Sequence, residues 1–280
     1  MKFKFYFLVL FLIFNRAKAQ NDLLQEIDTA KVENIYQPSF KALQIVTSQS
    51  TKLSAKNEWY IVIAHRFGDI STGFKDFFGL DDASTKLGVI YGVTDGISLS
   101  VSRETYMKTF EFGAKYRLLQ QKNRSPFDIV GYHVMAINTD LSKDDYPNIK
   151  FANRLSYLTQ ALISRRFNDR FSLQVMPSFI HKNLYDPGIE DKNQFFAGLG
   201  GRHKISKRIS VNAEYFVNID NHSYYKNPLS VGLDIETGGH VFQLVFSNSQ
   251  INSDIGYLTN AAGNWGKGNI YFGFNLYRVF

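Results

Sequence analysis

The 280-residue chain is rich in aromatic residues, with 25 Phe and 16 Tyr, has no Cys, and carries a formal net charge of +7. The lack of Cys excludes disulfide scaffolds and thiolate chemistry. Four basic residues and no acid precede residue 20, so the remaining chain carries only +3. Since that part has no basic block, we predict no nucleic-acid partner.

The first nineteen residues have the three-part layout of a secretory signal. Lys2 and Lys4 precede an apolar run over 5–14, and Ala17-Lys18-Ala19 follows it. The apolar run is about half the roughly 20 residues that a membrane-spanning helix needs. We predict a signal peptide over 1–19, cleaved after Ala19, and hence an exported protein.

The mature chain has an apolar residue at mostly every second position, which is the period of a β-strand. In an exported chain without helix-length apolar spans, this period favours an all-β fold, an antiparallel transmembrane β-barrel of about 12 strands. We predict the strands at residues 57–67, 84–93, 96–103, 109–119, 127–137, 155–167, 171–181, 194–204, 209–217, 229–237, 240–248 and 268–280.

The links between these strands alternate in length. Short or moderate links fall at 94–95, 120–126, 168–170, 205–208 and 237–239, and longer ones fall between them, with 104–108 as one short exception. Outer-membrane barrels place short turns in the periplasm and long loops outside. The order therefore predicts that the N-terminal arm and Phe280 lie on the periplasmic side, with the barrel over 57–280.

Residues 20–56 do not fit the strand count. Residues 21–32 have the polarity of a helix, and 40–46 could form a strand. We predict a short N-terminal arm that lies in the periplasm or inside the lumen.

The alternation assigns each side chain to the lipid or to the lumen. Aromatic residues at strand ends are expected to form girdles at the membrane interface; they are Trp59, Tyr91, Phe167, Phe171, Tyr277 and Phe280. Polar residues of the other parity are candidates to line the lumen; they are Glu58, Tyr60, Arg66, Glu111, Lys115, Arg117, Gln160, Arg166, Gln174, Arg202, Asn212, Glu214, Asp234 and Gln243. These side chains either fill a narrow lumen with mutually satisfied pairs, which we favour slightly, or line a water-filled path.

Candidate chemical groups are sparse. Six His residues are scattered without metal-ligand spacing, and the acidic loop residues do not match a calcium-binding pattern, so we predict no metal and no cofactor. Asp220 and His222 share one outer loop and are the only candidate pair for acid/base catalysis. We assign no catalytic residue.

Four segments, HRFGDI at 65–70, FFGLDDASTKLG at 77–88, YGVTDGISL at 91–99 and WGKGNIYFGFNLYRVF at 265–280, resemble a family of bacterial outer-membrane β-barrel domains of unknown function. The resemblance implies a Gram-negative outer-membrane barrel and supplies no site residues. The last strand also resembles the signal read by the barrel-assembly machinery, through Phe272, Phe274, Leu276 and Phe280. It departs from that signal at Arg278.

These observations predict a monomeric outer-membrane barrel, in contact with outer-membrane lipid, with a passive-transport (porin-like) or envelope-structural role and no enzymatic activity. Two alternatives remain. One is a barrel enzyme of lipase or protease type with a site at the outer rim. The other is a secreted soluble β-barrel that binds a small apolar ligand, whose exterior would be polar.

Overall fold

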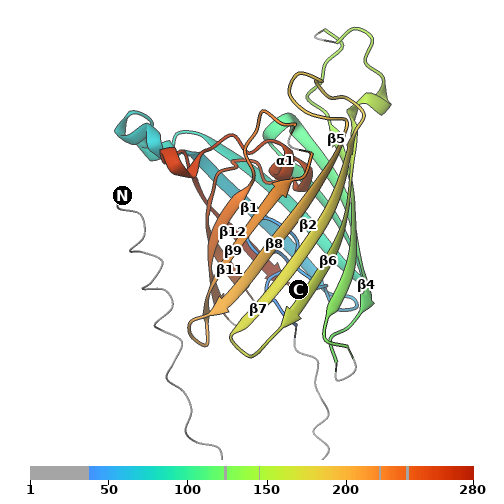
Figure 1. Ribbon diagram of the computed structural model, residues 1–280, viewed down its shortest axis with the longest axis vertical. Coiled ribbons are helices and arrows are strands. Elements are labelled where there is room, and N and C mark those ends of the chain that lie inside the picture. The colour runs from blue at the N-terminus through green and yellow to red at the C-terminus, as the bar shows by residue number, and fades with distance from the viewer. Residues whose placement is uncertain (1–37, 123–124, 145, 221, 238–239) are drawn as a thin grey trace, which may run out of the picture. The chain divides into compact units, whose positions relative to one another are not determined.

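The computed structural model describes residues 38–122, 125–144, 146–220, 222–237 and 240–280. The predicted signal peptide and the arm up to residue 37 lie outside the described residues. The described part is a closed barrel in which each strand pairs with its sequence neighbours and the first strand pairs with the last (Figure 1). Its elements are β1 (Trp59–Asp69), β2 (Ala83–Thr94), β3 (Ile97–Glu104), β4 (Thr109–Leu119), β5 (Asp128–Asn138), β6 (Leu155–Arg166), β7 (Phe171–Lys182), β8 (Asn193–Lys204), β9 (Ile209–Asn218), β10 (Leu229–Thr237), β11 (His240–Ser247) and β12 (Tyr271–Val279).

The barrel closes where the chain ends. β1 and β12 run antiparallel, with Tyr60 opposite Val279 and Ile63 opposite Leu276. The main chains of Trp59 and Phe280 exchange two hydrogen bonds, at 3.2 and 2.9 Å. The terminal strand therefore removes the sheet edges that an open sheet would leave unpaired.

The two ends of the barrel differ in their connections. The short links β2–β3, β4–β5, β6–β7, β8–β9 and β10–β11 share one end with Trp59 and Phe280, here called the turn end. The other end, the loop end, carries the longer links and the short helices; these are η1 (Ile70–Gly79), η2 (Tyr106–Lys108), η3 (Phe151–Arg154), α1 (Asp254–Thr259) and η4 (Trp265–Lys267). Among the described residues, no helix is long and apolar enough to cross a membrane.

Strand alternation separates an apolar exterior from a mostly polar interior. Along β9, exposed and buried residues alternate without a break, so Val211 and Val217 face outward and Asn212 and Glu214 face inward. Exposed apolar side chains recur on the other strands, among them Leu87, Val89, Leu99, Val101, Phe112, Val175, Leu199 and Phe246. This exterior suits lipid, and it is inconsistent with the soluble alternative, which required a polar outer surface.

The predicted strands agree with the observed ones to within two residues, except at the start of the last. That strand begins at Tyr271 because Gly268 adopts φ +77° after the turn of η4 and breaks the extended chain. The first strand begins at Trp59 because Asn57 has φ +66°. Left-handed residues cannot continue a β-ladder.

Aromatic residues gather at the turn end. Trp59 and Tyr91 pack with ring centroids 4.3 Å apart, and Phe167 and Phe171 lie 5.8 Å apart. Tyr277 does not belong with them, so its assignment to the girdle is wrong. Its ring is only 2% exposed and its hydroxyl donates to Gln44 Oε1, because Tyr277 has the inward parity of Asn275.

Candidate functional site

The interior of the barrel is occupied by residues 38–55, drawn in blue inside the strands in Figure 1. Within this segment, the N–H of Ile45 donates to Ser48 O at 2.8 Å and the N–H of Ser50 to Leu43 O at 3.0 Å. We call residues 43–50 the lumen hairpin. The sequence allows a strand over 40–46, but among the described residues the hairpin makes one isolated bridge, between Gln44 and Gln49.

The tip of the lumen hairpin surrounds the carboxylate of Glu214, on β9. The N–H groups of Val46, Thr47 and Ser48 donate to it at 3.1, 2.8 and 3.0 Å, and the Ser48 hydroxyl donates at 2.5 Å. Successive backbone N–H groups that converge in this way form an anion-binding nest. The buried negative charge is therefore stabilised by the hairpin itself.

Lys115, on β4, holds the base of the same segment. Its ammonium donates to the carbonyl oxygens of Leu43, Ser50 and Lys52 at 2.9, 3.0 and 3.4 Å. A lysine ammonium has three N–H donors, so these three carbonyls use its full capacity. Lys115 is buried, so its ammonium is hydrogen-bonded to main-chain carbonyl oxygens of the segment in place of water.

Neutral wall residues complete this recognition of the main chain. Gln174 accepts from Thr51 N at 3.0 Å and donates to Gln49 O at 2.7 Å. Two further amides donate to hairpin carbonyls; these contacts are Asn275 to Val46 O at 2.7 Å and Gln243 to Ile45 O at 3.1 Å. The side chains of the barrel wall therefore bind the segment mainly through the main-chain N–H and C=O groups of the segment.

Arg66, on β1, lies beside the hairpin and is only 1% exposed. Its guanidinium donates to Asn275 Oδ1 at 2.9 Å and to Thr47 Oγ1 at 3.3 Å. The ion pairs recorded for the described residues include none for Arg66. It is a buried cation held by neutral oxygens, which is a high-energy arrangement unless all its donors are satisfied.

A second segment enters the lumen from the loop end. Residues 248–264, here called the inward loop, contain α1 and are largely buried. The Glu104 carboxylate accepts the N–H groups of Asn252 and Ser253 at 2.5 and 2.8 Å. Glu111 accepts the N–H of Asp254 at 2.8 Å. Two wall carboxylates thus hold the start of α1, whose N–H groups have no helical partner.

Lys86 pairs with two of the carboxylates in this region. Its ammonium lies 2.6 Å from Glu111 and 3.2 Å from Asp254. The Asp254 carboxylate also accepts from the Tyr132 hydroxyl at 3.1 Å and from Gln49 Nε2 at 2.9 Å. Through Gln49, the inward loop meets the lumen hairpin, so the two segments are joined within the barrel.

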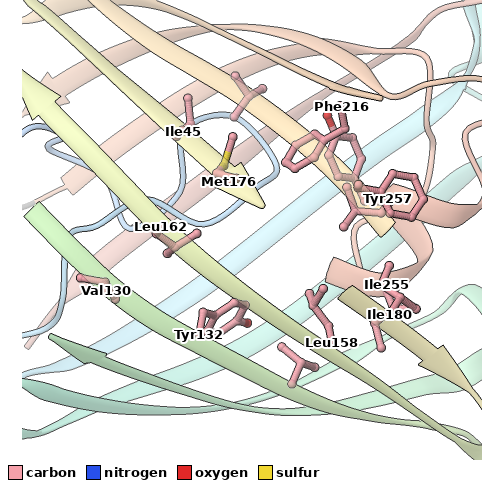
Figure 2. Packing of buried hydrophobic residues seen from close by; sticks show 14 of the residues in the cluster. Ile45, Val130, Tyr132, Leu158, Leu162, Met176, Ile180, Phe216, Ile255 and Tyr257 are labelled. Carbon is pink, nitrogen blue, oxygen red and sulfur yellow. The ribbon is translucent and has the colours of Figure 1, made fainter. Parts of the chain in front are cut away.

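An apolar cluster accompanies these polar contacts in the lumen (Figure 2). Ile45 of the hairpin lies near Met176, and Tyr257 of α1 lies against Phe216, with ring centroids 6.0 Å apart. Ile255 packs in the same cluster as the inward-facing Leu158 and Ile180. Burial raises the pKa of Tyr257 well above its usual value, with the Glu214 charge as a second cause, so its phenol stays neutral.

The structure divides the predicted lumen residues into three groups. Arg66, Lys115, Gln174, Glu214 and Gln243 contact the hairpin segment, and Glu111 contacts the inward loop. Tyr60 packs in one cluster with Ala42 and Leu43 of the hairpin segment. Four others, Gln160, Arg202, Asn212 and Asp234, are buried elsewhere in the wall; for example, Arg202 pairs with Glu236 at 2.6 Å. Glu58, Arg117 and Arg166 are only partly buried. Lys86 and Glu104 were not predicted, although the strand parity of Lys86 could have identified it.

The two candidate acid/base residues have separate partners. Asp220 accepts the N–H of Phe195 at 2.8 Å, whereas His222 Nδ1 lies 3.0 Å from Asp191. Both members of the His222–Asp191 pair are about half exposed. Among the described residues, Asp220 and His222 therefore do not form the acid/base pair that their sequence positions suggested.

Comparison with known proteins gives one family and several structures. The family model described as "Membrane bound beta barrel domain (DUF5777)" matches residues 40–280. A solved structure named KdgM porin is 12% identical, with a TM-score of 0.51, over 79% of this chain and 99% of that chain. A second, of KdgM porin with disordered oligogalacturonate, is also 12% identical, with the same coverage and a TM-score of 0.50. No curated protein sequence matches. At this identity the two structures support the barrel fold alone, and fold and family together point to the outer membrane.

Proposed function

The chain belongs to the family of membrane-bound β-barrel domains, and we propose that it is a non-enzymatic outer-membrane channel for passive transport, closed here by the lumen hairpin and the inward loop. The observation that carries this proposal is that charged side chains of the barrel wall bind the segment around the lumen hairpin through hydrogen bonds. Glu214 accepts from three main-chain N–H groups and the hydroxyl of Ser48, and Lys115 donates to three main-chain carbonyl oxygens, of Leu43, Ser50 and Lys52; neither is in a direct ion pair among the described residues.

This arrangement favours a removable occupant. Charges without a direct ion-pair partner are costly inside a permanently packed core, where apolar residues would serve stability better. When the hairpin leaves and water enters, both charges become hydrated, which lowers the free energy of the open state. The open wall would then expose Arg66, Lys115, Gln174 and Glu214 around the lumen, since they lie on β1, β4, β7 and β9.

A structural role is the second candidate, and the apolar cluster favours it. Ile45 and Tyr257 bury apolar surface against the wall, and about 25 cal/mol for each Å² of that surface opposes opening. In this case the barrel would stay filled and would serve the envelope as a stable membrane body.

Planar-bilayer conductance of the purified mature chain, starting at Gln20, separates the two roles. We expect brief openings for the natural chain and a much higher open probability for a Glu214→Ala, Lys115→Ala variant. Asp169→Ala, in an exposed turn, is the control and should behave like the natural chain. Neutralising Arg66, Arg117 and Arg202 in turn should alter ion selectivity. Silence of every variant in correctly folded form would reject the channel in favour of the structural role.

The remaining parts of the proposal concern export and assembly. The signal peptide would be removed after Ala19, and the barrel would be monomeric in outer-membrane lipid. The outward residues Phe272, Phe274 and Leu276 of β12, with Phe280, would be read by the barrel-assembly machinery. Mass spectrometry of the outer-membrane form tests the cleavage site directly, since a mature chain that does not begin at Gln20 would disprove it.

A further inference from the structure

A cavity of about 620 Å³ opens above α1 at the loop end. This volume falls within the roughly 300–1,000 Å³ of small-molecule sites. Its walls come from four loops, each of which contributes one tyrosine; these are Tyr106, Tyr146, Tyr185 and Tyr225. We call this cavity the vestibule.

Three of the five charged side chains in the vestibule wall belong to ion pairs, since Glu111 pairs with Lys86 and Lys182 pairs with Glu190. Lys182 lies 2.6 Å from Glu190, which also accepts from Gln194 Nε2 at 2.8 Å. Arg154 donates to Asn138 O at 3.3 Å. The other two, Arg154 and Asp186, carry opposite charges, so the wall together with Lys86 has no net formal charge. The remaining surface offered to a ligand consists of phenols, amides, hydroxyls and apolar side chains.

This surface suits a ligand that has both flat C–H faces and many hydroxyl groups. Phenol rings pack against the apolar face of such a molecule, and their hydroxyls and the amides of Asn138, Asn153 and Asn260 form hydrogen bonds at its edges. Burial raises the pKa of Tyr106, with nearby Tyr225 and Glu104 as further causes. Its phenol therefore remains a donor over the physiological range.

The floor of the vestibule is the inward loop. Ser253, Ile255, Gly256 and Thr259 line the cavity, while Asp254, in the same turn, contacts Lys86, Tyr132 and Gln49 within the lumen. A molecule in the vestibule thus rests directly on the segment that closes the barrel.

We propose that the vestibule binds a short neutral oligosaccharide, with Tyr146 and Tyr185 as stacking platforms and α1 as the floor. The role of this site as the place where a solute first binds before transport rests on the proposed channel function. Binding of the sugar itself does not require the barrel to conduct. The ligand class follows from the combination of tyrosines, amides and a wall whose formal charges balance.

The test is isothermal titration of the mature barrel in a detergent without a sugar headgroup, such as lauryldimethylamine oxide. The probes are maltohexaose, cellohexaose and chitohexaose, with hexaglycine to detect a preference for peptides. We expect at least one hexasaccharide to bind and hexaglycine not to bind. Replacing both platforms, Tyr146→Ala with Tyr185→Ala, should weaken binding by about tenfold or more.

Tyr224→Ala is the matched control, because Tyr224 is 77% exposed and neighbours Tyr225 without lining the vestibule. It should leave sugar binding unchanged. The proposal is overturned if no hexasaccharide binds to folded barrel, if hexaglycine binds instead, or if the double variant binds sugar like the natural chain. Sugar binding by a barrel that never conducts would keep this site and reject the channel, whereas conduction without sugar binding would reject this site alone.

Discussion

Gln49 Nε2 donates a hydrogen bond of 2.9 Å to Asp254 Oδ1, and this contact joins two segments that are 205 residues apart in the chain. One segment reaches the contact from the turn end and the other from the loop end. Since Asp254 is also bound to Lys86 and Tyr132, the Gln49 amide is attached to the wall network through a charged acceptor. The two closing segments should therefore respond together to a change at either one.

Gln49→Met removes this contact while preserving side-chain length. Hydrogen bonds to charged groups contribute about 1.5–3 kcal/mol, so we expect a loss of that order in the free energy of unfolding, measured by urea titration in micelles. Gln250→Met is the control, because Gln250 donates to Asp82 at 2.8 Å at an exposed site. Its cost should stay below about 1 kcal/mol. Equal losses for the two variants would show that the buried contact has no special weight.

Glu214→Gln should loosen the lumen hairpin. The amide has one acceptor oxygen in place of two and turns an N–H₂ group toward the N–H groups of Val46, Thr47 and Ser48. Because the chain has no Cys, Ala42→Cys provides a single thiol at a buried position of the same segment. We expect maleimide labelling at residue 42 to accelerate by about tenfold or more, which corresponds to about 1.4 kcal/mol in the opening equilibrium.

Asp169→Asn, combined with Ala42→Cys, controls for the loss of one negative charge. Asp169 pairs with Arg166 in an exposed turn and does not contact the hairpin. Labelling in this control should match that of Ala42→Cys alone. If Glu214→Gln also leaves labelling unchanged, the hairpin is held by its apolar contacts and the nest around Glu214 is unimportant.

Val89→Arg tests which surface meets lipid. Val89 lies in the middle of β2 and faces outward. Arginine on the lipid face near the bilayer midplane costs about 2–4 kcal/mol, whereas the cost near the interface falls to about 0–1 kcal/mol. We expect that difference between Val89→Arg and the loop control Tyr224→Arg, when both are refolded into lipid vesicles. A harmless Val89→Arg would contradict the placement of this strand in the membrane.

The positions of the strands and the inward or outward orientation of their side chains could be predicted from the sequence, because both depend on local sequence patterns. Period-two alternation in 209–218 specifies which residues of β9 are buried, and the observed pattern matches residue by residue. The same rule places Lys115 and Glu214 inside without any knowledge of their partners. Tyr277 shows that residue type can mislead, since aromatic character suggested the interface and strand parity places it in the lumen.

The contents of the lumen could not be predicted in this way. The lumen hairpin and the inward loop have no strand period, and most of their contacts join residues far apart in the sequence, for example 65 residues between Lys115 and Ser50 and 229 between Asn275 and Val46. The inward loop looked like an external loop because it joins the last two strands at the loop end. Its apolar residues Ile251, Ile255 and Leu258 have helical spacing, which is the one local sign of a buried face.

Gly92→Ala should disturb the point where the N-terminal segment leaves the lumen. A Cβ at Gly92 would lie 1.8 Å from the carbonyl oxygen of Ala55, which the main chain cannot accommodate without moving. The hydrogen bond from Asn57 N to Gly92 O, at 2.7 Å, belongs to the same contact. We expect the free energy of unfolding to fall by about 1–3 kcal/mol. We also expect faster maleimide labelling of Ala42→Cys, because a shift of residues 55–57 displaces the residues before them in the lumen.

Gly96→Ala in the adjacent turn is the matched control. The nearest atom to a Cβ there is Thr94 Oγ1 at 3.9 Å, an ordinary contact, so this variant should be neutral or more stable by about 0.4–1 kcal/mol. The contrast isolates the close approach of Ala55 from the general effect of replacing glycine. If the two variants have the same stability and the same labelling rate, residues 55–57 are not fixed against β2, and the N-terminal segment is anchored by the lumen contacts alone.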